Sequence, residues 1–244
     1  MLTLNCDLGE LVGEANNDAL IMPLIDQANI ACGFHAGDAK TMRDTVALAV
    51  KHQVSIGAHP SYPDRNNFGR TSMNMEDNAL KKCITEQVAA LHVICQAQNT
   101  QLSYIKPHGA LYNDMMASLA IFETICQAIS IIKHPLSLMM QALPELQQYK
   151  AIAEKYHIPL IFEGFADRAY QSNGLLVRRS HPGALLNDPE KVLARITRLI
   201  NQQQLTSIDG KALNLTIDSL CVHGDNKAAL ALLTSLRRLI NDSI

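Results

Sequence analysis

The short strand-like segments of this chain each have one apolar face and one polar face, and this alternation limits the fold more than any other feature. Side chains alternate between the two faces of a strand. In the first segment Leu2 and Leu4 therefore share one face, and Asn5 and Asp7 share the other. The same alternation recurs in residues 28–35, 54–59 and 219–225. In each case the polar face ends in an ionisable side chain, so a sheet built from these strands has a helix-covered side and a second, polar side.

The apolar segments alternate along the chain with segments that have helical spacing, which is typical of parallel strands joined by crossover helices. Strands are predicted at 2–7, 28–35, 54–59, 102–108, 136–141, 159–165 and 219–225. Helices are predicted at 40–52, 76–98, 117–132, 144–157, 189–203 and 226–240. An open doubly wound sheet buries both faces under helices, whereas a closed barrel has one outer face and one lumen. The pattern favours a seven-stranded (β/α) barrel over a flavodoxin-like open sheet, with the active site at the carboxyl ends of the strands.

Length and composition are compatible with one barrel domain over residues 1–244. The net charge of −2 disfavours a nucleic-acid binder, and no apolar run is long enough to span a bilayer. The start of the chain lacks a secretory signal pattern. Six scattered cysteines indicate free thiols and a cytoplasmic protein.

Three local signals mark further features of the fold. Asp209-Gly210 predicts a short hairpin, residues 175–186 predict an irregular loop, and Asp38 is a candidate helix cap.

Chemically active side chains gather at the predicted strand ends. They are Asn5, Asp7, Glu10, His35, His59, Arg70, Lys106, His108, Glu163, Asp167, Arg168, His223 and Asp225. Several charges at one rim must be paired with one another or with a ligand. A lysine facing the lumen needs a carboxylate partner, so Lys106 is expected to have either a structural ion pair or a catalytic role.

The residues alone leave a metal site open and give no support to two other kinds of site. Asp7, His35 and His59 could bind a divalent metal ion with an open coordination position. The sequence has no GxGxxG, GxxxxGK[ST] or GxSxG motif, so it supports neither a P-loop nor a nucleophilic serine.

The strand-end motifs closely resemble those of the LamB/YcsF family, the A subunit of bacterial ATP-dependent 5-oxoprolinase. The resemblance covers nearly the whole chain and is carried by residues 5–10, 28–38, 57–60, 106–113, 165–168 and 221–225. It implies a barrel of the glycoside hydrolase/deacetylase type and hydrolysis of the 5-oxoproline lactam to L-glutamate. It also implies ATP as co-substrate, with Mg²⁺, and separate B and C subunits as partners.

For that reaction the candidate catalytic residues are Asp7, His59, Lys106, His108 and Glu163. Asp7 or Glu163 is expected to be the base, and Lys106 with His108 to stabilise negative charge. The candidate substrate-binding residues are Asn5, Glu10, His35, Arg70, Asp167, Arg168, His223 and Asp225. The alternatives are a metal-dependent deacylase or amidohydrolase and a non-catalytic binding barrel. Assembly with further copies of the chain stays open.

Overall fold

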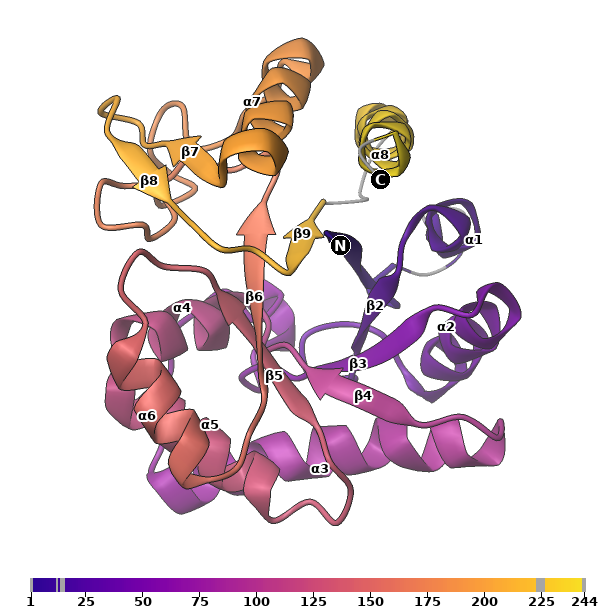
Figure 1. Ribbon diagram of the computed structural model, residues 1–244. Coiled ribbons are helices and arrows are strands. Elements are labelled where there is room, and N and C mark those ends of the chain that lie inside the picture. Colours follow the sequence, from indigo (N-terminus) through magenta and orange to yellow (C-terminus); the bar gives the residue numbers. More distant parts are fainter. Residues whose placement is uncertain (1, 12, 14–15, 223–226, 243–244) are drawn as a thin grey trace.

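The computed structural model describes residues 2–11, 13, 16–222 and 227–242. Within these residues seven parallel strands close into a barrel, in the order β1-β2-β3-β4-β5-β6-β9 (Figure 1). The strands are β1 (Thr3–Leu8), β2 (Gln27–Ala31), β3 (Ser55–His59), β4 (Leu102–Ile105), β5 (Ser137–Gln141), β6 (Leu160–Phe165) and β9 (Ser219–Cys221). Ser219 in β9 pairs with both Thr3 and Glu163, which closes the ring between β1 and β6. The predicted seven-stranded (β/α) barrel is confirmed.

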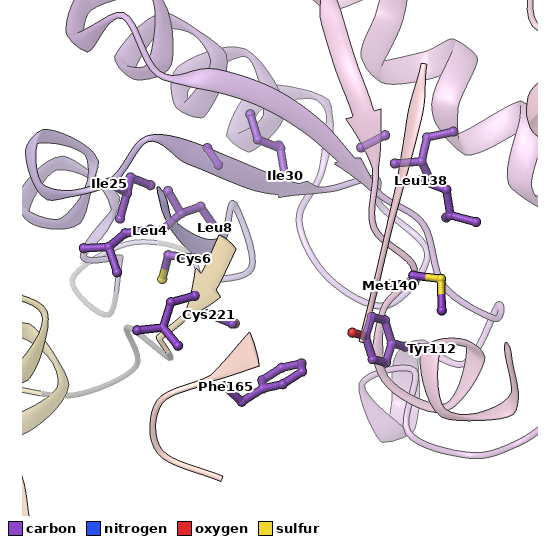
Figure 2. Packing of buried hydrophobic residues seen from close by; sticks show 14 of the residues in the cluster. Leu4, Cys6, Leu8, Ile25, Ile30, Tyr112, Leu138, Met140, Phe165 and Cys221 are labelled. Atoms are coloured by element: carbon purple, nitrogen blue, oxygen red, sulfur yellow. The ribbon is translucent and has the colours of Figure 1, made fainter. Parts of the chain in front are cut away.

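Helices surround the barrel on the outside (Figure 1). They are α1 (Asp18–Ile21), α2 (Ala39–His52), α3 (Asp77–Ala97), α4 (Gly109–Ala117), α5 (Leu119–Ser130), α6 (Gln147–Lys155), α7 (Pro189–Gln202) and α8 (Lys227–Asn241), with 3-10 turns at Met22–Leu24 and Arg65–Asn67. The apolar face of β1 lies under this layer: Leu4 and Leu8 are buried, and Figure 2 shows them beside Ile25. Burial of each such side chain stabilises the fold by roughly 1.5–3 kcal/mol.

Local signals set the bounds of the helices closely. The side chain of Asp38 accepts a hydrogen bond from the Thr41 backbone N–H, so the predicted cap of α2 is confirmed. Asp188 caps α7 in the same way, with Pro189 at the first helical position. No described helix is long and apolar enough to cross a membrane.

The predicted hairpin is present as β7 (Gln204–Thr206) and β8 (Ala212–Asn214), which pair antiparallel. Gly210 lies in its turn with φ +84°, a conformation that favours glycine. Residues 175–186 form an irregular excursion held by isolated bridges, such as the one between Arg168 and Leu185, as predicted. All six cysteines are free and buried, which confirms the prediction of free thiols.

Several elements differ from the predictions, and β4 also ends early, at Ile105. The second strand ends at Ala31 rather than at His35, because Gly33 turns the chain with φ +92° and donates to the Ala36 carbonyl. Helix α4 was not predicted, since its residues are mostly apolar on every side and give no helical stripe. The four-residue α1 was also missed. The last strand ends at Cys221, and residues 223–226 of the predicted strand and helix lie outside the described part of the chain.

Candidate active site

A buried ion-pair triad lies at the polar end of the barrel. Lys106, just after β4, places its Nζ 2.9 Å from Asp7 Oδ1 and 2.8 Å from Glu163 Oε1. The side chains of Lys106 and Glu163 are 3% and 0% exposed, whereas that of Asp7 is 18% exposed. Burial alone would lower the pKa of Lys106, but the adjacent carboxylates of Asp7 and Glu163 outweigh it and raise that pKa well above its usual value. Lys106 is therefore a fixed cation between two carboxylates.

Tyr112 completes the buried side of the triad. Its hydroxyl donates to Glu163 Oε2 over 2.8 Å. Burial, reinforced by the negative charge of Glu163, raises the pKa of Tyr112 well above its usual value, so the hydroxyl remains a donor. Glu163 is thus engaged at both oxygens, while Asp7 is the carboxylate of the triad that reaches solvent.

A chain of amides forms the floor beneath the triad. Asn29 Nδ2 donates to Asp7 Oδ1 over 2.8 Å and to Asn5 Oδ1 over 2.9 Å. Asn5 in turn donates to the Ser219 hydroxyl, and the Tyr104 hydroxyl donates to Asn29 Oδ1. Because each of these polar groups is buried, its hydrogen bond fixes the orientation of the next.

Glycine makes room for this floor. A Cβ built on Gly57 would lie 2.2 Å from Cε2 of the Tyr104 ring. The ring can therefore lie across β3 only because residue 57 has no side chain. The small residue that the sequence shows on the polar face of this strand has a packing function inside the lumen.

A second cluster consists of Glu10, His35, His59 and His108. One ligand atom from each residue lies within 4.8 Å of the others, and the three histidines are buried. The rings of His35 and His108 stack with centroids 3.8 Å apart, and the ring of His59 stands edge-on to both. Asp7 Oδ2 lies 3.4 Å from His59 Nε2, so this cluster borders the triad.

Burial keeps two of the imidazoles neutral. It lowers the pKa of His35 to about 2 and that of His108 to about 3. A neutral imidazole has one nitrogen that donates and one that accepts or binds a metal. The group therefore has the donor set of a metal site: imidazole nitrogens and one carboxylate.

The segment after β3 holds this cluster in place. Phe68 and Gly69 both adopt left-handed backbone conformations, with φ +56° and +64°, and the Phe68 carbonyl accepts from His108 Nε2 over 2.9 Å. A Cβ on Gly69 would lie 2.9 Å from His35 Cβ. At Gly109 a Cβ would lie 2.5 Å from the Gly69 carbonyl oxygen, so both glycines allow two loops to pack closely against the histidines.

Most of the predicted site residues come together here. Asn5, Asp7, Lys106 and Glu163 form the floor and triad, and Glu10, His35, His59 and His108 form the second cluster. Two surface hollows, of about 600 Å³ beside Lys81 and about 420 Å³ beside Arg195, contain none of these eight residues. Of these eight residues, Asp7 and Glu10 are the most exposed, at 18% and 17%. We therefore expect a ligand to approach the site from the edge that these two side chains form.

Three predicted substrate contacts belong to neither the triad nor the histidine cluster. Arg70 is exposed, with its guanidinium 5.1 Å from the Phe68 ring centroid. Arg168 is buried and donates to the Val177 carbonyl over 2.7 Å, so it holds the 175–186 excursion. Asp167 is half-buried beside it. His223 and Asp225 lie outside the described residues.

The group that could hold a metal ion overlaps with the expected one. It contains His35 and His59, and it adds Glu10 and His108. Asp7 borders it, with Oδ2 3.4 Å from His59 Nε2, while its Oδ1 accepts from Lys106 and Asn29. Glu10 joins the group because Gly9, with φ +69°, turns the chain after β1 and brings Glu10 toward the histidines.

The sequence interpretation overlooked three residues of the network: Asn29, Tyr104 and Tyr112. Asn29 and Tyr104 share the lumen-facing parity of Asp7 and Lys106 on their strands, so the alternation contained this signal. Tyr112 lies on α4, and its role could not be seen without predicting that helix.

Comparison with known proteins agrees with this architecture. The sequence profile of the LamB/YcsF family matches residues 2–243. A curated protein of Vibrio parahaemolyticus, named as the A subunit of 5-oxoprolinase, is 46% identical over 239 residues, covering 97% of this chain and 94% of that protein. One of the same name from Pseudomonas fluorescens is 45% identical over 243 residues, covering 99% and 97%.

Two solved structures show the same fold. The lactam utilization protein of Thermus thermophilus superposes with a TM-score of 0.90 at 32% identity, covering 99% of this chain and 96% of that one. A putative cellobiose-phosphate cleavage protein of Enterococcus faecalis superposes with a TM-score of 0.56 at 11% identity, covering 99% and 94%, which concerns the fold alone.

Proposed function

Because the chain belongs to the LamB/YcsF family, we propose that it hydrolyses the lactam of 5-oxoproline to L-glutamate in a reaction coupled to ATP hydrolysis. Its relatives named as 5-oxoprolinase A subunits and its structural relative named a lactam utilization protein support an activity on lactams. We further propose that it acts in the cytoplasm within an assembly containing B and C subunits, with ATP and Mg²⁺ as co-substrate. The observation that carries the proposal is a buried lysine between two carboxylates at the rim of this family's barrel.

The chemistry requires activation of an unreactive amide. Transfer of the γ-phosphoryl group of ATP to the lactam oxygen releases ADP and makes the ring carbon electrophilic. Water then adds to that carbon and loses a proton to a base, and the C–N bond breaks as the nitrogen takes up a proton. A second water hydrolyses the resulting acyl phosphate to glutamate and phosphate.

The geometry favours Asp7 as the base. Its side chain is 18% exposed and so reaches a bound ligand, whereas Glu163 is fully buried with both oxygens engaged. Lys106, held by both carboxylates, supplies the positive charge that stabilises oxygen anions in the transition state. We assign Glu163 a positioning role, because it acts through Lys106 and does not reach the solvent-facing edge.

The test is 5-oxoproline-dependent release of ADP and L-glutamate after the chain is mixed with its B and C subunits. We expect Asp7→Asn to lower kcat by about 10²–10⁴-fold, the usual contribution of a general base. Asp44→Asn is the matched control, since Asp44 is an exposed carboxylate on α2 that pairs with Lys40. Absence of glutamate release by the wild-type assembly, or equal rates in Asp7→Asn and Asp44→Asn, would contradict the proposal.

A second reaction, metal-dependent deacylation, is favoured by the group of one glutamate and three histidines. It predicts hydrolysis of N-acyl substrates by the isolated chain, without ATP or partners, and loss of that activity on chelation. A lack of turnover by the metal-loaded chain on a panel of N-acetyl sugars and N-acyl amino acids counts against it.

A further inference from the structure

The four donor atoms of the histidine cluster are spaced as ligands of one ion would be. Glu10 Oε1 lies 3.3 Å from His35 Nε2, 3.4 Å from His108 Nδ1 and 3.9 Å from His59 Nε2. A tetrahedral ion bound at 2.0–2.1 Å places its ligand atoms about 3.3 Å apart. The observed distances therefore suit such an ion with only small movements of the side chains.

Backbone carbonyls fix the orientation of two of the rings. His59 Nδ1 lies 2.6 Å from the Lys106 carbonyl oxygen, and His108 Nε2 lies 2.9 Å from that of Phe68. A carbonyl oxygen can only accept, so these two nitrogens are the ones that carry protons. Metal-bound histidines commonly donate their second ring N–H to a backbone carbonyl in this way.

The remaining nitrogens of those two rings then face each other. His59 Nε2 and His108 Nδ1 lie 2.9 Å apart, so both nitrogens point into the same small space. An ion bound there can take a lone pair from each ring. Neither ring can flip without losing its hydrogen bond to a backbone carbonyl.

The charges around the cluster also favour a cation. At this end of the barrel, among the buried and partly buried groups of the described residues, the carboxylates of Asp7, Glu10 and Glu163 face the ammonium of Lys106. The guanidiniums of Arg65 and Arg70 also act on His35, but both arginines are exposed to solvent. A divalent ion among the histidines would offset this excess of negative charge. Asp7 Oδ2, 3.4 Å from His59 Nε2, would lie at the boundary between the ion and the triad.

We propose that Glu10, His35, His59 and His108 bind one divalent transition-metal ion of the zinc class. Three imidazole nitrogens suit Zn²⁺, Co²⁺ or Ni²⁺, whereas Mg²⁺ and Ca²⁺ require mostly oxygen ligands. The site is distinct from the Mg²⁺ that would accompany ATP. It does not depend on lactam hydrolysis, and either proposal can fail without the other.

The experiment measures metal binding by the full chain after chelator treatment and dialysis. Zn²⁺ is titrated in competition with a chromophoric chelator, and Co²⁺ is followed by its visible absorption, which is intense for tetrahedral coordination. We expect one equivalent of Zn²⁺ with a Kd below about 1 µM, and no displacement by millimolar Mg²⁺.

Ligand variants locate the ion. We expect His59→Gln and His108→Gln to weaken Zn²⁺ binding by at least about 100-fold and to abolish the tetrahedral Co²⁺ spectrum. Glu10→Gln changes a partly exposed ligand, so it tests the site even if a buried histidine variant fails to fold. His134→Gln is the matched control, because His134 stacks on His92 outside this cluster, with ring centroids 4.2 Å apart.

The outcomes separate cleanly. Wild-type binding retained in His134→Gln but lost in Glu10→Gln and His108→Gln supports the site. Less than about 0.1 equivalent of bound Zn²⁺, or equal affinity in wild type and in folded His108→Gln, overturns it. Neither measurement uses 5-oxoproline, ATP or partner subunits, so failure of the metal site is distinguishable from failure of the proposed reaction.

Discussion

Replacement of Lys106 by methionine tests whether this lysine neutralises two buried carboxylates. The substitution keeps a similar volume but removes the charge that lies 2.9 Å from Asp7 and 2.8 Å from Glu163. Glu163 is fully buried, so water cannot replace the lost partner. The fold must then hold an uncompensated carboxylate inside the barrel.

The expected cost follows from the charges. Two unit charges about 4 Å apart attract by about 4 kcal/mol at an effective dielectric constant of about 20, and removal of one partner of a buried pair typically costs about 3–5 kcal/mol. We therefore expect Lys106→Met to lower the free energy of unfolding by about 4 kcal/mol. Glu163→Gln should lower the free energy of unfolding by only about 1–2 kcal/mol, because Lys106 retains Asp7, the amide oxygen can accept from Lys106, and the Tyr112 hydroxyl can turn to accept the amide N–H.

The two changes should be strongly coupled. In the double variant Lys106→Met/Glu163→Gln the buried carboxylate is gone, and the 18% exposed Asp7 can be partly hydrated. We expect the double variant to lower the free energy of unfolding by about 2–3 kcal/mol, which is less than the loss in Lys106→Met alone. Urea unfolding followed by far-UV circular dichroism gives each free energy at one pH and ionic strength.

An exposed ion pair of similar length serves as the control. Lys155 Nζ lies 2.7 Å from Glu123 Oε1, but the two side chains are 62% and 32% exposed. The cycle built from Lys155→Met and Glu123→Gln should show coupling below about 1 kcal/mol. If the Lys106 cycle is additive within about 0.5 kcal/mol, the lysine does not neutralise Glu163 and the reasoning is refuted.

Three further substitutions test other parts of the site. Gly69→Ala places a Cβ 2.9 Å from His35 Cβ at a φ of +64°. We expect the free energy of unfolding to fall by about 2 kcal/mol, measured as a fall in Tm of roughly 4–8 °C, and an unchanged Tm would show that the loop moves without strain. Gly57→Ala should displace the Tyr104 ring and lower the free energy of unfolding by about 1–3 kcal/mol. In a Tyr104→Ala background the same change should lower it only slightly. Equal losses in both backgrounds would exclude the ring as the cause. Burial raises the pKa of Asp18 above its value in the unfolded chain, so the wild type loses stability as the pH rises from about 4. The stability of Asp18→Asn should therefore increase relative to that of the wild type between pH 4 and 7. A difference in urea midpoint that stays constant over this range would contradict the reasoning.

The barrel could be predicted because its determinants are local. Alternation between Leu4 and Asn5 gives β1 its two faces, Asp38 marks the start of α2, and Asp209-Gly210 marks the hairpin turn. Each signal lies within a few residues of the element it specifies. The convergence of Lys106 and Glu163 follows as well, since parallel strands bring their carboxyl ends to one rim.

The details of the site could not be predicted, because loops set them. His35 lies four residues beyond the end of β2, and its position depends on the backbone of Gly33 rather than on strand parity. Arg168 is a candidate substrate-binding residue by sequence, yet its guanidinium donates to the Val177 carbonyl in a loop with no regular pattern. Side-chain reach after a turn is a property of tertiary packing, which alternation does not encode.

The division of the rim into two halves gives the site its chemical logic. In one half Lys106 and Glu163 are buried and paired with each other, and Glu163 also accepts from Tyr112, so their charges are fixed before any ligand arrives. In the other half His59 and His108 have their outward nitrogens fixed by backbone carbonyls and their inward nitrogens directed at one point. Asp7 is in contact with both halves and is partly exposed. In the reaction proposed above, a ligand that reaches Asp7 would meet the ammonium of Lys106 on one side and the histidine cluster on the other, so the fixed cation would polarise the amide while Asp7 removes a proton from water.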